Sequence, residues 1–315
     1  MNSSNKSIRD PSRVDPLQVP EGTIQVKWGS AIFIVALHLI VFVGGFLALF
    51  GLIPSFFSWP AFYMMIGLIP ILGWGGIGMG YHRLFTHQSF TCRSWFSRLL
   101  CILGGCNLEG SMLWWVSTHR RHHQKVDTQP DPHTPLVNFL WAHVGWLLFF
   151  NSAIEGANVY QNTRDLQKDG FNVLMHKYNL WTFFWALHVV IIFFIGFLFG
   201  VSLGGEVDPY QNGISFVVWA VLVRTVIFWN VTWLVNSATH VWGYQNYPSD
   251  DESRNNWWVA IFTGGEGWHS NHHHDQVSAS NQHRWWEVDL VYCAIKILAA
   301  VSVITSYKKS DRNKV

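Results

Sequence analysis

Histidines at repeated spacings are the residues of this sequence best suited to carry out chemistry. The stretch from His119 to His123 has the pattern H-x-x-H-H, and the stretch from His269 to His273 repeats it. On a helix, positions i, i+3 and i+4 share one face, so each stretch can direct three imidazoles at one point. A third stretch places His82 and His87 five residues apart. Because imidazole is a common ligand of iron, zinc, copper and nickel, this pattern predicts a metal site.

The number of histidines predicts more than one metal ion, because a closed zinc site uses only about four ligands. On an α-helix, side chains five residues apart diverge by about 140°, so we expect His82 and His87 to bind different ions. Asn236 and His240 are four residues apart and share a helix face, so His240 is a candidate ninth imidazole. Asn236 is expected to reach the metal directly or through a water.

The histidine pattern alone does not choose the metal. Redox-inert zinc would suit hydrolysis, non-haem iron would suit oxygen activation, and a purely structural zinc site is the third possibility. The remaining histidines are expected to be structural: His38 and His188 should hydrogen-bond a neighbouring helix. No ligand role is expected for four others, His133, His143, His176 and His283.

The composition is that of a membrane protein. Apolar residues make up 50% of the chain, charged residues only 13%, and there are 19 tryptophans. The net charge of +2 gives no reason to expect nucleic-acid binding. The four cysteines contain no C-x-x-C pair, so we expect no disulfide framework.

The distribution of charge predicts an all-α integral membrane protein with four transmembrane helices. No acidic or basic residue occurs from Trp28 to His82, which is long enough for two spans of about 20 residues each. We expect spans at about 29–51, 58–79, 180–200 and 214–236. Arg224 lies inside the fourth span, so its side chain should face protein or extend to a headgroup. Residues 1–28 are expected to form a flexible tail, 29–306 a single domain, and 307–315 a basic tail.

Three shorter apolar stretches are expected not to span the membrane. Residues 95–116 are interrupted by charge and should form a buried or interfacial helix, and residues 136–150 are too short. Residues 288–306 should form an amphipathic surface helix, with a fifth span as the alternative. The glycine-rich run 73–80 should allow close helix packing or line a tunnel.

The basic residues predict the orientation. The loops after the first and third spans contain no Lys or Arg. Of the 21 Lys and Arg residues, all except Arg224 lie in the two terminal segments or in the central block between the second and third spans. The positive-inside rule therefore places both termini and every histidine stretch on the cytoplasmic side, where they can meet.

The sequence closely resembles the membrane fatty acyl desaturases, in particular the Δ9 group of cyanobacteria and plants, related to the stearoyl-CoA desaturases. The resemblance runs from the first span to about residue 298. The motifs that carry it are HRLFTH at 82–87, HRRHH at 119–123, DPH at 131–133, AHVGWL at 142–147, NSATHVWG at 236–243, ESRNNWWVAIFTGGEGWHSNHH at 252–273 and RWWEVDL at 284–290.

The resemblance implies a cytoplasmic helical cap that holds a histidine-rich di-iron site, with two Fe²⁺ ions as cofactors. One iron would take His82, His119, His123 and His272. The other would take His87, His122, His240, His269 and His273, with Asn236 as a ligand through water.

The implied reaction uses O2 and two electrons to remove one hydrogen each from C9 and C10 of a saturated C16–C18 acyl chain. An apolar tunnel with a bend would position C9 and exclude water. In relatives a Trp, a Thr and a Gln line the bend, and they map to Trp115, Thr232 and Glu109. Pro70 and Trp74 map to the positions that limit chain length. Trp74 is bulkier than the residue in some relatives and should shorten the tunnel, whereas Pro70 is smaller and should lengthen it. Together they imply C16 to C18 chains, with C16 slightly favoured.

The resemblance also implies an external electron donor. No H-P-G-G motif of a fused cytochrome b5 domain is present, so the electrons are expected to come from a separate protein. The likeness to the cyanobacterial group implies ferredoxin, with cytochrome b5 as the alternative. The acyl carrier stays open between glycerolipid, coenzyme A and acyl carrier protein. Two other functions share the histidine motifs: a di-iron lipid hydroxylase, and a non-catalytic metal-binding membrane protein.

Overall fold

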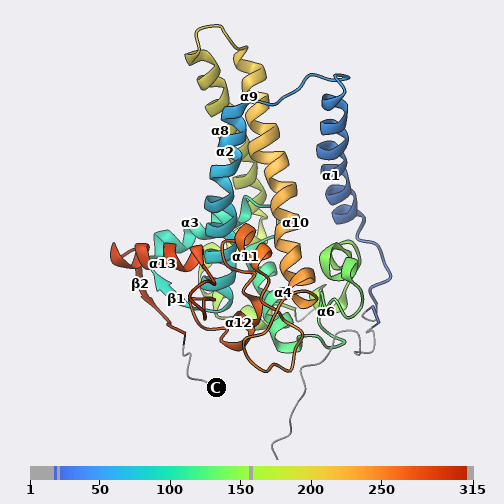
Figure 1. The fold of residues 1–315 in the computed structure, drawn as a ribbon, viewed down its shortest axis with the longest axis vertical. Helices are drawn as coiled ribbons and strands as arrows, with labels where there is room; N and C mark the ends of the chain where they lie inside the picture. The colour runs from blue at the N-terminus through green and yellow to red at the C-terminus, as the bar shows by residue number, and fades with distance from the viewer. Residues whose placement is uncertain (1–17, 20–21, 156–158, 311–315) are drawn as a thin grey trace, which may run out of the picture.

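The computed structural model of the protein describes residues 18–19, 22–155 and 159–310, and it is mostly helical. Four helices in this part of the chain are long and apolar enough to cross a membrane, which confirms the predicted number of spans. They rise from one side of a cap of short helices and loops (Figure 1). Most of the expected N-terminal tail, and residues 311–315 of the expected basic tail, lie outside the described residues.

The spans agree with the predicted positions. The first is α1 (Trp28–Leu49), and the third is α8 (Leu180–Ser202). The second is α2 (Trp59–Leu68) continued by a π-helical segment, η2 (Ile69–Thr86). The fourth consists of α9 (Pro209–Val217), η6 (Val218–Val223) and α10 (Arg224–Ser237).

Local sequence signals start the second and fourth spans. Ser58 caps α2 by accepting a hydrogen bond from the backbone N–H of Ala61, and Pro60 follows in the first turn. Asp208 caps α9 in the same way, accepting from the backbone N–H of Gln211 at 2.8 Å. A proline in the first turn costs no hydrogen bond, since its missing N–H would have no partner inside the helix.

The second and fourth spans are longer than predicted, because both continue past the apolar segment into the cap. η2 extends to Thr86 and carries His82. The fourth span ends in a 3-10 turn, η7 (Ala238–His240). These two extensions bring candidate metal ligands from distant parts of the sequence into the cap.

The cap is built from short elements. Those before the third span are β1 (Phe90–Cys92), α3 (Ser94–Gly105), α4 (Met112–Lys125), η3 (Trp141–Gly145), α5 (Trp146–Leu148), α6 (Ser152–Glu155), η4 (Val159–Thr163), η5 (Leu166–Lys168) and α7 (Gly170–Lys177). Those after the fourth span are α11 (Trp257–Thr263), α12 (His269–His274), α13 (Leu290–Ala300) and β2 (Ile304–Tyr307).

Two apolar stretches of the cap differ in how well they match the prediction. The stretch 136–150 forms only the short turns η3 and α5, which confirms that it does not span a membrane. The single helix predicted over 288–306 is wrong beyond Ala300, because the chain turns there at Ser302, with a φ of 59°, and enters β2. β2 pairs with β1 in an antiparallel two-stranded sheet, so the fold is not purely α-helical.

A buried core joins the spans to the cap. Tyr81, Phe85, Met112, Val116 and Phe228 belong to one apolar cluster formed by η2, α4 and α10.

The glycine-rich run allows close helix packing, as expected, while its role in lining a tunnel stays a prediction. A Cβ atom on Gly76 would lie 2.4 Å from the backbone nitrogen of Gly104, so α3 approaches η2 at a distance only glycine permits. Gly78 lines a small cavity.

Arg224 faces protein rather than the headgroups. Its side chain is completely buried, and its guanidinium donates to Asn107 Oδ1 at 2.8 Å and to the carbonyl oxygens of Cys106 and Ala220. Water cannot solvate a charge inside a span, and these protein acceptors take its place around the guanidinium.

The two histidines in the spans behave differently. His38 is hydrogen-bonded through Nε2 to Asn230 Nδ2 of α10 at 3.1 Å, as predicted. His188 was predicted to bond a neighbouring helix as well, but neither of its ring nitrogens has a partner in the described part of the chain. Its neighbours along α8 are almost all apolar, so the helix offers this ring few polar groups.

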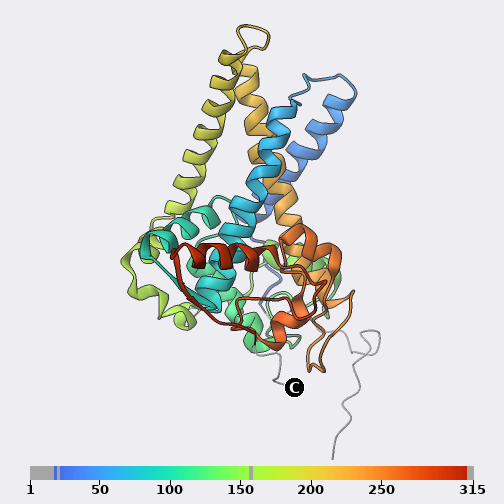
Figure 2. The ribbon, with the colours of Figure 1, turned by 60° about the vertical axis from the view of Figure 1, so that its left-hand side comes forward.

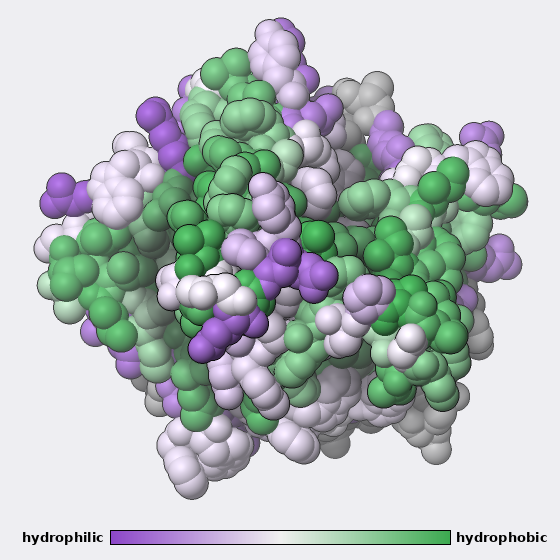
Figure 3. All heavy atoms as spheres, turned by 90° about the horizontal axis from the view of Figure 1, so that it is seen from above, coloured by the Kyte–Doolittle hydropathy of each residue, from purple (hydrophilic) through white to green (hydrophobic). Residues whose placement is uncertain are grey.

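The surface of the spans is apolar. Exposed side chains include Ile40, Phe42, Phe194 and Leu198. Hydrophobic atoms cover much of the molecule when it is viewed from above the spans (Figure 3), and the α8–α9 hairpin rises furthest from the cap (Figures 1 and 2). A soluble protein rarely exposes apolar area on this scale, so the spans are suited to lipid.

Candidate metal centre

The nine predicted histidines come together in the cap, below the ends of the second and fourth spans. Seven of them are buried, and the other two, His87 and His123, are partly exposed. They come from η2 and the residue after it, from α4, from η7 and from α12. Their nitrogen atoms form two groups of mutually close potential ligands: His82, His87, His119, His123 and His272 in the first, and His122, His240, His269 and His273 in the second.

The first group converges through its Nε2 atoms. His272 Nε2 lies 3.1 Å from His82 Nε2 and 3.1 Å from His123 Nε2, and His123 Nε2 lies 3.1 Å from His119 Nε2. Two nitrogens bound to one ion at about 2.1 Å and at right angles would lie roughly 3.0 Å apart. The spacing therefore suits shared coordination of one metal ion.

The second group shows the same convergence. His273 Nε2 lies 3.0 Å from His269 Nε2. The Nε2 atoms of His122 and His240 are buried and have no hydrogen-bond partner among the described residues. A buried acceptor without a partner is costly, and a bound metal ion would satisfy each of these lone pairs.

His87 lies closer to His82 than the sequence suggested, while the assignment of the two histidines to different ions stays a prediction. Both belong to the first group, and their ring centroids are 4.8 Å apart. The angle of 140° assumed an α-helix, but the chain here is a π-helix, and the N–H of His87 bonds the carbonyl of His82 at 3.2 Å. A π-helix makes i→i+5 hydrogen bonds, so residues five apart lie one above the other.

Four carboxylates orient histidines from behind, each at the Nδ1 atom. Glu266 lies 2.8 Å from His82, Asp131 lies 3.0 Å from His122, Asp127 lies 3.2 Å from His240, and Asp251 lies 3.2 Å from His273. At His122, His240 and His273 the contact is a hydrogen bond, and an Nδ1–H that donates to a carboxylate leaves Nε2 as the lone pair that faces the centre. No spacing in the sequence predicted a role for these acids, although Asp131 opens the DPH motif.

The ionisation of these acids fits that role. Burial raises the pKa of Asp251, but His273 and Ser253 outweigh burial, and the pKa falls well below its usual range. Burial is likewise outweighed at Glu266, where Arg83 and His82 lower the pKa to about 2. At Asp131, burial dominates and raises the pKa to about 6. All three groups are therefore predominantly ionised at neutral pH.

Burial and neighbouring rings keep several histidines of the cap neutral. Burial lowers the pKa of His119, His123 and His272 well below the usual value, and neighbouring imidazoles lower it further. The same causes, in the same order, lower the pKa of His122 and His269. Neutral imidazole is the form that binds metal, so the site is prepared for ligation at neutral pH.

His133 is closer to the site than the sequence suggested. Its ring centroid lies 4.4 Å from that of His122, and both side chains neighbour Asp131, which forms a third potential metal group with them. His143 and His176 instead make hydrogen bonds elsewhere, to Ser237 and Ser111.

A mostly apolar cavity of about 390 Å³ reaches the first histidine group. Its wall includes His119, Asn236, Trp115, Thr232 and Glu109. This volume falls within the range of small-ligand pockets. A second cavity of about 50 Å³ shares four of these wall residues and continues toward Ile77 and Phe228.

Glu109 links the other two residues predicted at the bend. Trp115 Nε1 donates to Glu109 Oε2 at 3.3 Å, and the Thr232 hydroxyl donates to Glu109 Oε1 at 3.0 Å. Burial raises the pKa of Glu109 to about 7, although both hydrogen bonds and Arg224 oppose the change. The three side chains therefore form one connected unit in the cavity wall.

Pro70 and Trp74 line neither of these two cavities. Trp74 Nε1 donates to the carbonyl of Phe262 at 2.9 Å, and the indole covers Gly264 so closely that an added Cβ would lie within 2.6 Å of it. The indole thus fixes α11 against η2.

Comparison with known proteins agrees with this arrangement. The fatty acid desaturase family model matches residues 58–296. The sn-1 stearoyl-lipid 9-desaturase of Anabaena variabilis is 39% identical over 290 residues, which are 92% of this chain and 97% of that protein. The sn-2 palmitoyl-lipid 9-desaturase of Nostoc sp. is 34% identical over 266 residues, 84% and 87% of the two chains. The acyl-CoA C20 Delta5-desaturase of Anemone leveillei is 35% identical over 290 residues, 92% and 87%. The family model and the relatives match most of the chain, which also has four apolar spans and nine converging histidines. This chain therefore belongs to the fatty acid desaturase family.

Proposed function

We propose that this chain introduces a cis double bond at C9 of saturated C16–C18 chains carried on membrane lipids. Its family makes it an oxygen-dependent acyl desaturase, an oxidoreductase of lipid metabolism. The position and the carrier follow the names of two relatives, which act on stearoyl-lipid and palmitoyl-lipid at position 9. The observation that carries the proposal is the convergence of imidazole nitrogens at the wall of an apolar cavity.

We propose that the nine histidines of the two groups together hold two iron ions, with Asn236 reaching the centre through a water. The partnerless Nε2 atoms of His122 and His240 support this assignment, as do the carboxylates behind four of the rings. The all-nitrogen donor set suits iron among the metals that bind imidazole. Bound iron would supply the one-electron chemistry by which O2 attacks an unactivated C–H bond.

The protein's own part is positioning and exclusion of water. The cavity is expected to hold the acyl chain so that C9 and C10 pass the histidines near Trp115, Thr232 and Asn236. Apolar walls keep water away from the reactive site, and a fixed chain position converts a general oxidant into a regioselective one.

The expected topology places the cap, both termini and the active site on the cytoplasmic side. The concentration of basic residues in the termini and the cap supports this orientation. The proposed electron donor is ferredoxin, with cytochrome b5 as the alternative.

Expression in a host that makes only saturated chains tests the function. Gas chromatography with double-bond location, run separately on each lipid class, should find C9 double bonds in glycerolipids. Hydroxylated chains would favour the di-iron hydroxylase, and unchanged saturated lipids beside a metal-loaded protein would favour the non-catalytic metal-binding protein.

Trp74→Ala tests the proposed control of chain length. We expect the variant to raise the ratio of desaturated C18 to desaturated C16 chains, because removal of the indole frees space beside η2 and α11. The ratio is measured from the same lipid extracts as for the wild type. An unchanged ratio would mean that Trp74 only packs α11 against η2.

Glu109→Gln tests the role of the carboxyl in the cavity wall. The folded chain holds this proton up to about pH 7, whereas the unfolded chain loses it near pH 4.5. The stabilising contribution is therefore complete below about pH 4.5 and is lost as the pH rises through about 7. Because glutamine does not ionise, the apparent unfolding temperature of the variant should fall less than that of the wild type between about pH 5 and 8. Parallel curves for the two proteins would show that Glu109 does not titrate in this range.

A further inference from the structure

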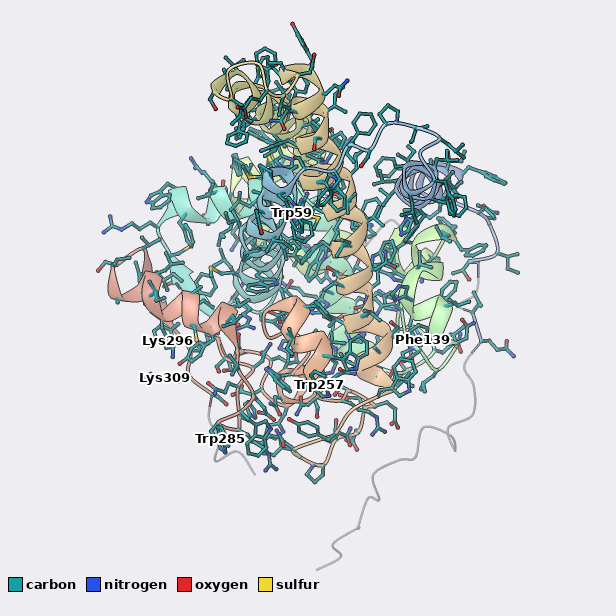
Figure 4. The ribbon with its side chains drawn as sticks, turned by 45° about the horizontal axis from the view of Figure 1, so that its top comes forward. Trp59, Phe139, Trp257, Trp285, Lys296 and Lys309 are labelled. Carbon is teal, nitrogen blue, oxygen red and sulfur yellow. The ribbon has the colours of Figure 1, made fainter. Side chains whose placement is uncertain are left out.

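The metal centre does not account for an exposed aromatic and basic surface of the cap. This surface consists of Tyr247, His274, Arg284, Trp285, Lys308 and Lys309, and we call it the donor face. Trp285 is 84% exposed and lies at the end of the molecule away from the spans (Figure 4). Large exposed aromatic side chains that share a surface with arginine are typical of a protein interface.

One hydrogen bond joins the two segments that carry the cations of the donor face. The Ser310 hydroxyl lies 3.1 Å from His283 Nε2, so the segment after β2, with Lys308 and Lys309, returns to the loop that carries Arg284. The guanidinium carbon of Arg284 lies 5.4 Å from the ring centroid of Trp286. Arg284, Lys308 and Lys309 are all exposed.

The charge of this face is mainly positive. Its three cations come from two segments, and the exposed acid of the Tyr247 loop is Asp250. Asp251, the next residue, is turned inward to His273. A partner that docks here is therefore expected to be acidic.

A short aromatic path connects the donor face to the histidines. The ring of Tyr247 stacks on that of His274 at 4.0 Å between centroids and 11° between planes, and the Tyr247 hydroxyl lies 3.0 Å from His283 Nδ1. His274 directly follows His273 in α12, and His273 Nε2 points to the second group. The exposed ring of His274 is therefore one residue away from His273, a proposed metal ligand.

We propose that the donor face is the docking surface of the external electron donor, a small acidic protein with a one-electron centre, and that the Tyr247–His274 pair lies on the electron path. The inference rests on the proposed function, which needs electrons from outside the chain. For each double bond, –CH2–CH2–, O2, two electrons and two protons give –CH=CH– and two waters. Each of two donor molecules is oxidised by one electron, and O2 is reduced.

Charge reversal tests the docking. The metal-loaded full chain is placed in nanodiscs, and its affinity for a reduced, acidic [2Fe–2S] ferredoxin is measured at about 50 and 200 mM salt. Lys308→Glu with Lys309→Glu should weaken binding about tenfold or more at low salt and flatten the salt dependence. Trp285→Ala should weaken binding by a similar factor, because exposed aromatics are frequent interface anchors.

Two control variants match these changes elsewhere on the cap. Lys168→Glu with Lys177→Glu makes the same charge change near α7, and Trp257→Ala removes another exposed indole, on α11. Both controls should bind ferredoxin within about twofold of the wild type. Desaturation is also compared with ferredoxin and with a small chemical reductant, and the ratio of the two rates should fall only in the donor-face variants.

The inference is overturned if the charge-reversed chain binds ferredoxin as tightly as the wild type, or if the α7 control loses as much affinity. Binding is read without turnover. A wild-type chain that desaturates with neither electron source would overturn the proposed function, while the affinities of the variants would still decide the docking surface.

Discussion

His272→Ala is expected to abolish desaturation, with a loss of at least about 100-fold, and to lower the iron content from two ions per chain to about one. His272 is the centre of the first group, since its Nε2 atom lies 3.1 Å from those of both His82 and His123. Its removal takes away the nitrogen that lies between two others of this group and leaves the ion with fewer ligands. The measurements are iron per chain by elemental analysis and desaturated product by gas chromatography.

His188→Ala is the matched control for this variant. His188 lies in α8, outside both histidine groups and both cavities, so its loss should leave two iron ions and desaturation close to the wild type. Full activity and two iron ions in His272→Ala would contradict the proposed metal centre.

Asp289→Ala is expected to cause the largest loss of stability, about 3–5 kcal/mol. Arg83 is 1% exposed and donates to both oxygens of Asp289, at 2.9 and 3.0 Å, as well as to Glu266. Asp289 also caps α13 by accepting from the backbone N–H of Tyr292. Without Asp289, the buried guanidinium of Arg83 keeps only one of its two carboxylate partners, and α13 loses its cap.

Thermal unfolding of the purified chain measures this effect, and a fall of roughly 10 °C in the apparent unfolding temperature is expected. Asp165→Ala is the control, because Asp165 bonds Arg120 with equally short distances but is about one third exposed. A partly exposed ion pair contributes only about 0–1 kcal/mol. Equal shifts in the two variants would mean that burial of the Arg83 network does not matter.

Much of this architecture can be predicted from the sequence, for simple physical reasons. A stretch without charge from Trp28 to His82 leaves few alternatives to membrane spans. Because α4 is a regular α-helix, His119 and His123, four residues apart, meet in the first group. The prediction that His122 points at the same spot is wrong, because its ring turns to the second group. The structure brings all nine predicted histidines into two adjacent groups, while their role as iron ligands stays a prediction.

The features that could not be predicted have equally specific causes. His87 joins the first group because η2 is a π-helix, and no side-chain spacing distinguishes that winding from an α-helix beforehand. The four carboxylates behind the rings were not predicted because each contact depends on the fold; Asp127, for example, meets His240 across 113 positions. The strand β2 was not predicted because its four residues follow an apolar helix without a proline or glycine between them.

The central claim is that this chain binds two iron ions through its histidines. Iron analysis and X-ray absorption on the purified, metal-loaded full chain test it most directly. Two iron ions per chain, each coordinated mainly by imidazole nitrogen, are the predicted result. Stoichiometric zinc, a single iron, or coordination mainly by oxygen or sulfur would contradict it.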